Sequence, residues 1–507
     1  MKVNRAPIME GLLEFNQQDP VRFHVPGHKG QAILSAEHKP YFAPMLRLDV
    51  TEVGELDDLH HPQGMIAEAQ RLAAEAFFAD QSYFLVNGST VGNMAMLFAV
   101  LERGDQVLVQ RNSHKSVFNS LALLEVEAVL IEPTICPTFH VPIGLTKLEV
   151  KAALELYPQA KAIMLTSPNY YGMIPPELSP IIQLCQEHDC IVLVDEAHGA
   201  HFGQHPSLPP SGMQLGADAS VQSTHKMLSS MTMTSMLHIQ GNRVEREDVE
   251  YYLASLQSSS PSYPLLASLD LARNFVQNLS SSDWENMLQN ILELRQKLSE
   301  IPGVILSPVE RKDGQYTSDP FKLTIQLEQS LSGYGLRDLL EEEQIYVELA
   351  DSHNILLTLP LQSEEEWKTR LVQALKRIVQ ENRYNKESRH KLTKEIEGTK
   401  EKSSKKESLQ LEGELVYGKK KIKTLQIRKY KKKDVEIISL DRAVDRRAAE
   451  MLIPYPPGIP ICLPNELITE ELLEDIYRLQ QQGAYFQGKP VDFNSLLVVK
   501  QGIQYNE

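Results

Sequence analysis

Between about residues 46 and 250, short apolar runs alternate with stretches of helical length. The runs typical of strands cover residues 82–87, 105–110, 128–134, 161–167, 190–197 and 219–224. Amphipathic connections such as GNMAMLFAVLER and PELSPIIQLCQEHD separate them. Apolar strands joined by crossovers of this length favour a mostly parallel sheet with helices on both faces. The sequence therefore predicts an α/β fold whose ligand crevice lies beyond the carboxyl ends of the strands.

The chain is too long for one compact domain, because it has 507 residues. We expect an N-terminal arm over 1–45 and a large domain over 46–262. Residues 283–301 have a clear 3.6-residue period and precede a strand-and-helix segment, which predicts a smaller α/β domain over 263–378. Residues 379–433 are rich in lysine and poor in apolar residues, which favours a solvated linker. A compact C-terminal domain is expected over 434–507.

The charge balance excludes some partners. The formal net charge is −16, which argues against general affinity for nucleic acid. The first twenty residues lack the apolar core of a signal peptide, and no window reaches transmembrane length, so we expect a cytoplasmic protein without a membrane partner.

Four cysteines do not make a disulfide framework. His24 and His28 have the spacing of a helical metal pair, but Pro26 and Gly27 oppose a helix there, so no metal site is expected.

Four strand ends carry candidate functional residues. The first is followed by a small-residue turn at 88–90 that enters a helix, which suits either a phosphate or an ordinary helix cap. His114 follows the second strand and could stack on a planar ligand or cap the next helix. Asp195 closes an apolar strand, where a carboxylate needs a partner. Lys226 lies in the small and apolar stretch ASVQSTHKMLSSMTMTSML, where it could extend to solvent or use its amine for chemistry.

Together these strand ends match the requirements of pyridoxal 5′-phosphate. The phosphate of this cofactor needs a helix N-terminus, its ring a stacking partner, its pyridine nitrogen a carboxylate and its aldehyde a lysine. A lysine desolvated in a pocket has a lowered pKa and can form a Schiff base. The order of the four sites along one alternating chain therefore favours a functional interpretation of Lys226.

The chain resembles the Orn/Lys/Arg decarboxylase family, in the short form without an N-terminal receiver-like domain. The resemblance rests on motifs spread over nearly the whole chain: FHVPGHKG (23–30), DVTEVGELDDLHHPQGMIAEAQ (49–70), VNGSTVGN (86–93), RNSHKS (111–116), SPNYYGM (167–173), VDEAHGAHF (194–202), QSTHKMLSSMTMTSML (222–237), SSSPSYPLLASLD (258–270) and YPPGIPICLPNE (455–466). It implies the large domain of a fold-type I pyridoxal-phosphate enzyme, with smaller C-terminal domains and a homodimer with shared active sites.

The resemblance also implies residue roles. Lys226 resembles the lysine that bonds to the cofactor aldehyde, and Asp195 the partner of its pyridine nitrogen. The other cofactor contacts implied are His198 near the phenolic oxygen, His114 on the ring face, and Ser89, Thr90, Ser223, His225 and Ser259 at the phosphate, the last from a neighbouring subunit. Glu466 resembles the residue that holds the distal cation of the substrate, although Asn465 replaces the usual glycine of this motif.

The resemblance implies decarboxylation of a small basic amino acid, with Lys226, His198 and Asp195 as catalytic residues. Either Lys226 or His198 could supply the proton. The short form favours arginine, giving agmatine and CO₂ for polyamine synthesis, with lysine or ornithine as alternatives. Two other interpretations stay open: an aminotransferase-like reaction on the same fold, and a non-catalytic regulator that keeps the scaffold.

Overall fold

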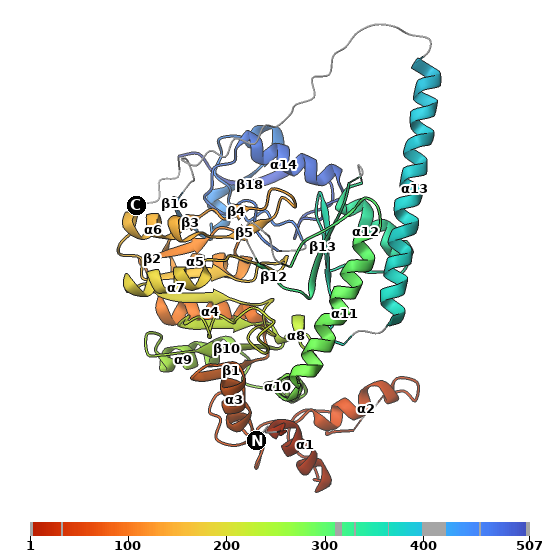
Figure 1. The fold of residues 1–507 in the computed structure, drawn as a ribbon. Coiled ribbons are helices and arrows are strands. Elements are labelled where there is room, and N and C mark those ends of the chain that lie inside the picture. Colours follow the sequence, from red (N-terminus) through yellow and green to blue (C-terminus); the bar gives the residue numbers. More distant parts are fainter. Residues whose placement is uncertain are drawn as a thin grey trace.

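An eight-stranded sheet forms the centre of the large domain (Figure 1). The computed structural model describes residues 4–31, 34–309, 317–328, 331–362, 365–397, 422–455 and 458–502. In spatial order the strands are β1 (Gln81–Leu85), β10 (Ser235–Ile239), β9 (Ala219–Gln222), β8 (Ile191–Asp195), β6 (Ala162–Thr166), β2 (Gln106–Gln110), β3 (Glu127–Ile131) and β16 (Ile422–Gln426). Parallel pairing joins β9, β8, β6, β2 and β3, whereas β10 and β16 run antiparallel to their neighbours. The predicted α/β fold with a mostly parallel sheet is confirmed.

Helices cover both faces of this sheet, because the side chains of each strand alternate between them. In β2, Val107 and Val109 pack into one apolar layer and Leu108 into the other. The first layer is completed by α4 (Gly88–Val100), α5 (Lys115–Leu124) and α9 (Arg246–Leu256), and the second by α6 (Lys147–Leu156) and α7 (Leu178–Glu187). Both faces are therefore buried, as the continuous apolar runs require.

The smaller domain is built on a four-stranded antiparallel sheet. Its spatial order is β11 (Val304–Leu306), β13 (Lys322–Leu327), β15 (Asn354–Thr358) and β14 (Leu349–Ala350). The helices of this region are α10 (Tyr263–Asn278), α11 (Ser281–Ser299), α12 (Gly333–Glu342) and α13 (Glu365–Glu397). The side chain of Ser280 accepts from the Asp283 amide and the Asp283 carboxylate accepts from the Ser280 amide, so a capping box begins α11 close to the predicted start of the periodic segment.

The N-terminal residues pack on the body of the molecule. Helix α1 (Pro7–Gln17) buries Ile8 and Leu12 in the core, and the Ile8 amide donates to the Asp270 carboxylate at 3.0 Å. Two further helices follow, α2 (Lys39–Leu48) and α3 (Met65–Ala76). Short ribbons pair β4 (Thr134–Ile135) with β5 (Pro142–Gly144) and β7 (Met173–Ile174) with β12 (Thr317–Ser318).

The boundaries of the segment predicted as a linker over 379–433 differ in the structure. Helix α13 extends into it as far as Glu397 and reaches beyond the small domain (Figure 1), while β16 adds an edge to the main sheet. Residues 398–421, which carry much of the lysine-rich sequence, lie outside the described part of the chain. The C-terminal domain contains β17 (Val435–Ser439), α14 (Glu470–Gln481) and β18 (Ser495–Val499). The short strand β16 was missed because only Leu425 of its five residues is buried, so the strand has no apolar alternation to read.

Candidate active site

A cavity of about 300 Å³ lies at the carboxyl ends of the parallel strands, where the open-sheet rule puts it. Eight of the ten predicted site residues line it: Ser89, Thr90, His114, Asp195, His198, Ser223, His225 and Lys226. Helix α8 (Thr224–Met227), which carries Lys226, lies where the sheet meets the small domain (Figure 1). The volume suits a small planar ligand with little free space around it.

The N-terminus of α4 opens into this cavity without a side-chain cap. Its N-cap residue, Asn87, makes no capping hydrogen bond to the described chain, and the Gly88 amide donates to the Met233 carbonyl at 2.7 Å. Among the described residues, the amides of Ser89 and Thr90 in this first turn have no partner and can serve a ligand. The hydroxyl of Ser89 lies 2.6 Å from the Ser223 hydroxyl and donates to Ser235 at 3.1 Å. Of the two interpretations of this turn, the geometry favours an anion site, because free amides, hydroxyls and the positive end of the helix dipole meet there.

Asp195 ends β8 and is 4% exposed. One carboxylate oxygen accepts from the Asn93 side-chain amide at 2.8 Å and the other from the Ala197 amide at 3.1 Å. Both donors are neutral. A buried carboxylate held only by neutral donors can still bind a cationic group that enters the cavity.

His114 both caps a helix and lines the cavity. Its ring accepts from the Ser116 amide at the start of α5. Burial lowers the pKa of His114 to about 4. The Asp195 carboxylate opposes this change, and the charge of Lys226 adds to it. Its uncharged ring borders the cavity. Gly458, at φ +90°, brings the backbone of the C-terminal domain against this ring. The Gly458 carbonyl accepts from the Lys115 amide at 3.4 Å. The two interpretations of His114 are therefore compatible.

Lys226 and His198 lie within hydrogen-bond distance of each other. The Lys226 Nζ is 3.1 Å from His198 Nε2 and 5.2 Å from the centre of the Tyr170 ring. Burial lowers the pKa of Lys226, although Asp195 opposes this change. Burial and the neighbouring Lys226 and Lys322 also hold the pKa of His198 well below its ordinary value. The environment favours a neutral amine and a neutral imidazole, the states that a nucleophilic lysine and an adjacent proton donor require.

Several polar residues at this site were not identified from the sequence. The side-chain amide of Asn112 borders the cavity, and its Nδ2 is buried with no hydrogen-bond partner among the described residues. The ring of Tyr170 lies against that of His198, with ring centres 4.3 Å apart and planes tilted by 54°, and Tyr455 lines the cavity from the C-terminal domain. The signal for Asn112 was its position in RNSHKS, directly after a strand end. An orphaned donor in this wall is consistent with a polar ligand.

Two predicted residues lie elsewhere. Glu466 is 8% exposed and is not among the residues that line the cavity. Its carboxylate accepts from Arg111 at 3.0 Å and Lys423 at 2.6 Å, and from the Leu463 amide at 2.6 Å. Ser259 is exposed on the loop before α10. In this single chain neither residue borders the cavity, so their roles toward substrate and a neighbouring cofactor stay predictions.

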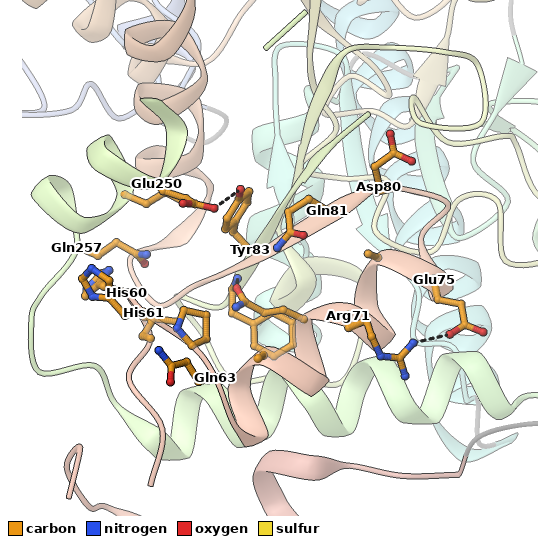
Figure 2. A pocket seen from close by; sticks show the side chains of 18 residues that line it. His60, His61, Gln63, Arg71, Glu75, Asp80, Gln81, Tyr83, Glu250 and Gln257 are labelled. Carbon is orange, nitrogen blue, oxygen red and sulfur yellow. Dashed lines mark hydrogen bonds and ion pairs between the residues drawn. The ribbon is translucent and has the colours of Figure 1, made fainter. Parts of the chain in front are cut away.

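A larger cavity, of about 840 Å³, lies along β1 and α3 and contains no predicted site residue (Figure 2). Three of its charged side chains already have partners within the lining: Glu250 accepts from the Tyr83 hydroxyl at 2.9 Å, and Arg71 lies 3.4 Å from Glu75. Size alone therefore does not identify the reactive site, which is distinguished by its convergent and incompletely paired groups.

Within the described ranges, no three His, Cys, Asp or Glu side chains are grouped so that they could hold a metal ion. No helix in that part of the chain is long and apolar enough to cross a bilayer.

Known proteins resemble this chain over nearly its whole length. A protein from Bacillus subtilis named as uncharacterized protein YaaO is 40% identical over 95% of this chain and 96% of its own length. An arginine decarboxylase from Halalkalibacterium halodurans is 33% identical over 98% of both chains. The structure of the constitutive lysine decarboxylase of Escherichia coli superposes with a TM-score of 0.78 at 20% identity, covering 98% of this chain and 82% of that one.

The match to a protein family extends over both parts of the chain. Residues 6–367 match the major domain of the Orn/Lys/Arg decarboxylases, and residues 421–491 match their C-terminal domain. The match includes the strand ends that border the cavity and the C-terminal segment that packs against His114. The chain therefore belongs to the Orn/Lys/Arg decarboxylase family.

Proposed function

We propose that this chain is a pyridoxal-phosphate-dependent decarboxylase of a basic amino acid, with L-arginine as the preferred substrate and agmatine as the product. The observation that carries this proposal is the buried Lys226 amine in one cavity with Asp195, His114 and the uncapped N-terminus of α4. The preference for arginine rests on the full-length relative that bears that name. Lysine is the second candidate substrate.

The residues present fit the cofactor. The uncapped amides of α4, with Ser89, Thr90, Ser223 and His225, would hold its phosphate, and Asp195 would hold a proton on its ring nitrogen. The flat and uncharged face of His114 would cover the ring. The orphaned Asn112 amide adds a donor at the same wall. Hydrogen-bond donors would thus face the anionic phosphate, and a carboxylate would face the protonated ring nitrogen.

The cofactor, when bound, supplies an electron-withdrawing ring that accepts the electrons released as CO₂ leaves. Lys226 contributes a neutral amine that can bond to an aldehyde, and Asp195 keeps the ring nitrogen protonated. His198 holds a hydrogen-bonding proton beside Lys226. The C-terminal domain, through Tyr455 and Ile459, helps to exclude water from the cavity.

We also propose that the active form is a homodimer. Ser259 would then reach the phosphate of the neighbouring subunit, and a rearranged Glu466 would face the substrate cation. Glu466→Gln would raise KM for arginine more than it lowers kcat if that role is correct.

A side-by-side assay of CO₂ release from arginine, lysine and ornithine tests the proposal. We expect arginine to give the highest kcat/KM, and cofactor addition to give an absorbance band near the visible range that Lys226→Ala lacks. Keto-acid formation in place of CO₂ would favour aminotransferase chemistry. Wild-type protein that shows neither the band nor turnover would contradict an enzymatic role.

A further inference from the structure

The side chain of Lys322 is buried on the far side of His198 from Lys226. Lys322 begins β13 in the small domain and is 1% exposed. Its Nζ lies 3.1 Å from His198 Nδ1 and donates to the Thr358 hydroxyl at 2.7 Å. The imidazole of His198 is thus held between two lysine amines, one on each ring nitrogen.

Lys322 has no ion-pair partner to explain its burial. In the described part of the chain, no carboxylate lies within 4.0 Å of its Nζ. Asp319, the nearest acid in sequence, is bound to His201 at 2.9 Å, with both side chains fully buried. An ammonium group without a counter-charge is unfavourable in a protein interior, so a purely structural lysine would be better replaced by an apolar residue. Its contact with His198 is the feature that distinguishes it.

The hydrogen-bonding capacity of a neutral imidazole decides how the ring is protonated. One ring nitrogen of neutral histidine donates and the other accepts, whereas an ammonium group can only donate. When Lys322 is charged, His198 Nδ1 must accept from it, and the ring proton must be on Nε2. That proton then points to the amine of Lys226 and into the cavity.

We infer that Lys322 is a positioning residue that keeps the proton of His198 on Nε2, so that His198 is the proton donor of the reaction. The inference rests on the proposed decarboxylation. It chooses between the two donors, Lys226 and His198, that the sequence left open.

The proton count of the reaction is consistent with this arrangement. Replacing the carboxylate on the α-carbon by hydrogen consumes one proton for each CO₂ released. As the Nε2–H bond breaks and the new C–H bond forms, a proton passes from Lys322 Nζ to His198 Nδ1, so the ring stays neutral. After product leaves, a solvent proton adds to Nε2 and the Nδ1 proton returns to the amine of Lys322. One solvent proton enters per turnover, and no oxidant or reductant is needed.

Other charged groups around the pair affect it. Lys226, Lys322, His114 and His225 all disfavour a charged His198 ring. Burial lowers the pKa of Lys322 to about 8, while Glu348 and Asp319 raise it and Lys226 lowers it. Lys322 therefore loses its proton on the alkaline side of neutrality, and above that pH Nδ1 is free to carry the ring proton.

The first experiment needs neither cofactor nor substrate. Nuclear magnetic resonance of cofactor-free protein with ¹⁵N-labelled histidine rings reports which nitrogen carries the proton, and His198→Asn identifies the signal. We expect the Nε2–H form near pH 7, a mixture of both forms in Lys322→Met, and recovery of the Nε2–H form in Lys322→Gln, whose neutral amide can still donate to Nδ1. Wild-type protein with the proton on Nδ1 would overturn the inference without any variant.

The second experiment is kinetic. We expect Lys322→Met to lower kcat about 100-fold with KM nearly unchanged, because the proton donor is no longer oriented. Lys322→Gln should retain more activity than Lys322→Met but lose the alkaline fall in kcat that begins near the pKa of Lys322. Lys368→Met serves as the matched control, because Lys368 is also buried but lies on α13 against Asn290 and should leave kcat unchanged.

The outcomes separate the two proposals. A kcat in Lys322→Met within threefold of wild type, or the same Nε2–H form in that variant, rejects the role of Lys322. If wild-type protein has the Nε2–H form but releases no CO₂ from arginine, lysine or ornithine, the proposed function fails while the effect of Lys322 on the histidine stands.

Discussion

Asp195 and Glu466 are both buried carboxylates near the same cavity, yet their surroundings are opposite. Among the described residues, Asp195 accepts hydrogen bonds only from the neutral donors Asn93 and Ala197, and it borders the cavity. Glu466 accepts from the cations Arg111 and Lys423 and does not line the cavity. Asp195 thus keeps its charge available for a ligand, whereas Glu466 joins the C-terminal domain to β16 and to the loop after β2.

This comparison shows that burial of a charge does not by itself reveal its purpose. A carboxylate with cationic partners is bound within the chain, so removing it leaves buried cations unpaired, whereas one with neutral partners keeps its charge available for a group from outside. Four substitutions or changes of condition test this difference, in order of decreasing effect.

The largest effect is expected from Asp195→Asn. The amide keeps the size of the side chain but removes the charge that would hold a proton on the cofactor ring. We expect kcat to fall about 10³-fold, as for loss of a major electrostatic group in an active site. Steady-state kinetics at saturating cofactor, with circular dichroism to check the fold, would measure this. A loss below tenfold would mean that Asp195 and Glu466 are not as different as their partners indicate.

The next effect concerns stability. Glu466→Ala leaves the guanidinium of Arg111 buried without its counter-charge, since the two side chains are 10% and 8% exposed. We expect the free energy of unfolding to fall by about 3 kcal/mol, the usual loss when one partner of a buried ion pair is removed. Urea unfolding followed by fluorescence measures it. Equal stability of variant and wild type would show that the pair with Arg111 contributes nothing.

The ion pair of Glu466 with Arg111 should also make the free energy of unfolding depend on pH in the acidic range. Burial alone would raise the pKa of Glu466, but Arg111, Lys423 and the Leu463 amide outweigh it, and the pKa lies below the ordinary 4.5. A lowered carboxyl pKa stabilises the folded chain above the unfolded pKa, and this stabilisation disappears as the pH falls through the folded pKa. The stability difference between wild type and Glu466→Gln should therefore shrink below about pH 4.5, as thermal unfolding at a series of pH values would show. A difference that stays constant at low pH would rule out this linkage.

The smallest effect is expected from Lys423→Met. The lysine side chain is 44% exposed, so its bond to Glu466 is weakened by water, and Glu466 keeps Arg111 in the variant. We expect a loss of about 0.5 kcal/mol in the free energy of unfolding. A loss as large as that of Glu466→Ala would show that β16, rather than the Arg111 pair, holds the C-terminal domain in place.

The sequence predicted the cavity well because its residues come from one repeating pattern. Parallel strands end on the same edge of a sheet, so Ser89, His114, Asp195 and Lys226 could be brought together without knowing any distance. The roles of these residues remain proposals. Lys322 was not predicted as a site residue, because the pattern KLTIQL is typical of an ordinary strand with Lys, Thr and Gln on its polar face. Only the docking of the small domain turns that face toward His198.

The ion-pair partners of Glu466 could not be predicted from the sequence either. Lys423 lies in a segment whose composition favours solvent exposure, and its antiparallel pairing with β3 depends on a contact between distant parts of the chain. Neither periodicity nor spacing carries information about such a contact. The resemblance to a family supplied Glu466, but not the ion pairs that the side chain makes here.

The position of β16 has a consequence for synthesis of the chain on the ribosome. Strand β3 is complete at Ile131, but its outer neighbour begins only at Ile422, and until then that edge of the sheet has no antiparallel partner. At a translation rate of roughly 5–20 residues per second, the nascent chain carries this open edge for about 15–60 s. An unpaired strand edge invites pairing with other chains. Prematurely terminated copies that lack β16 would therefore be the ones that chaperones and proteases must remove.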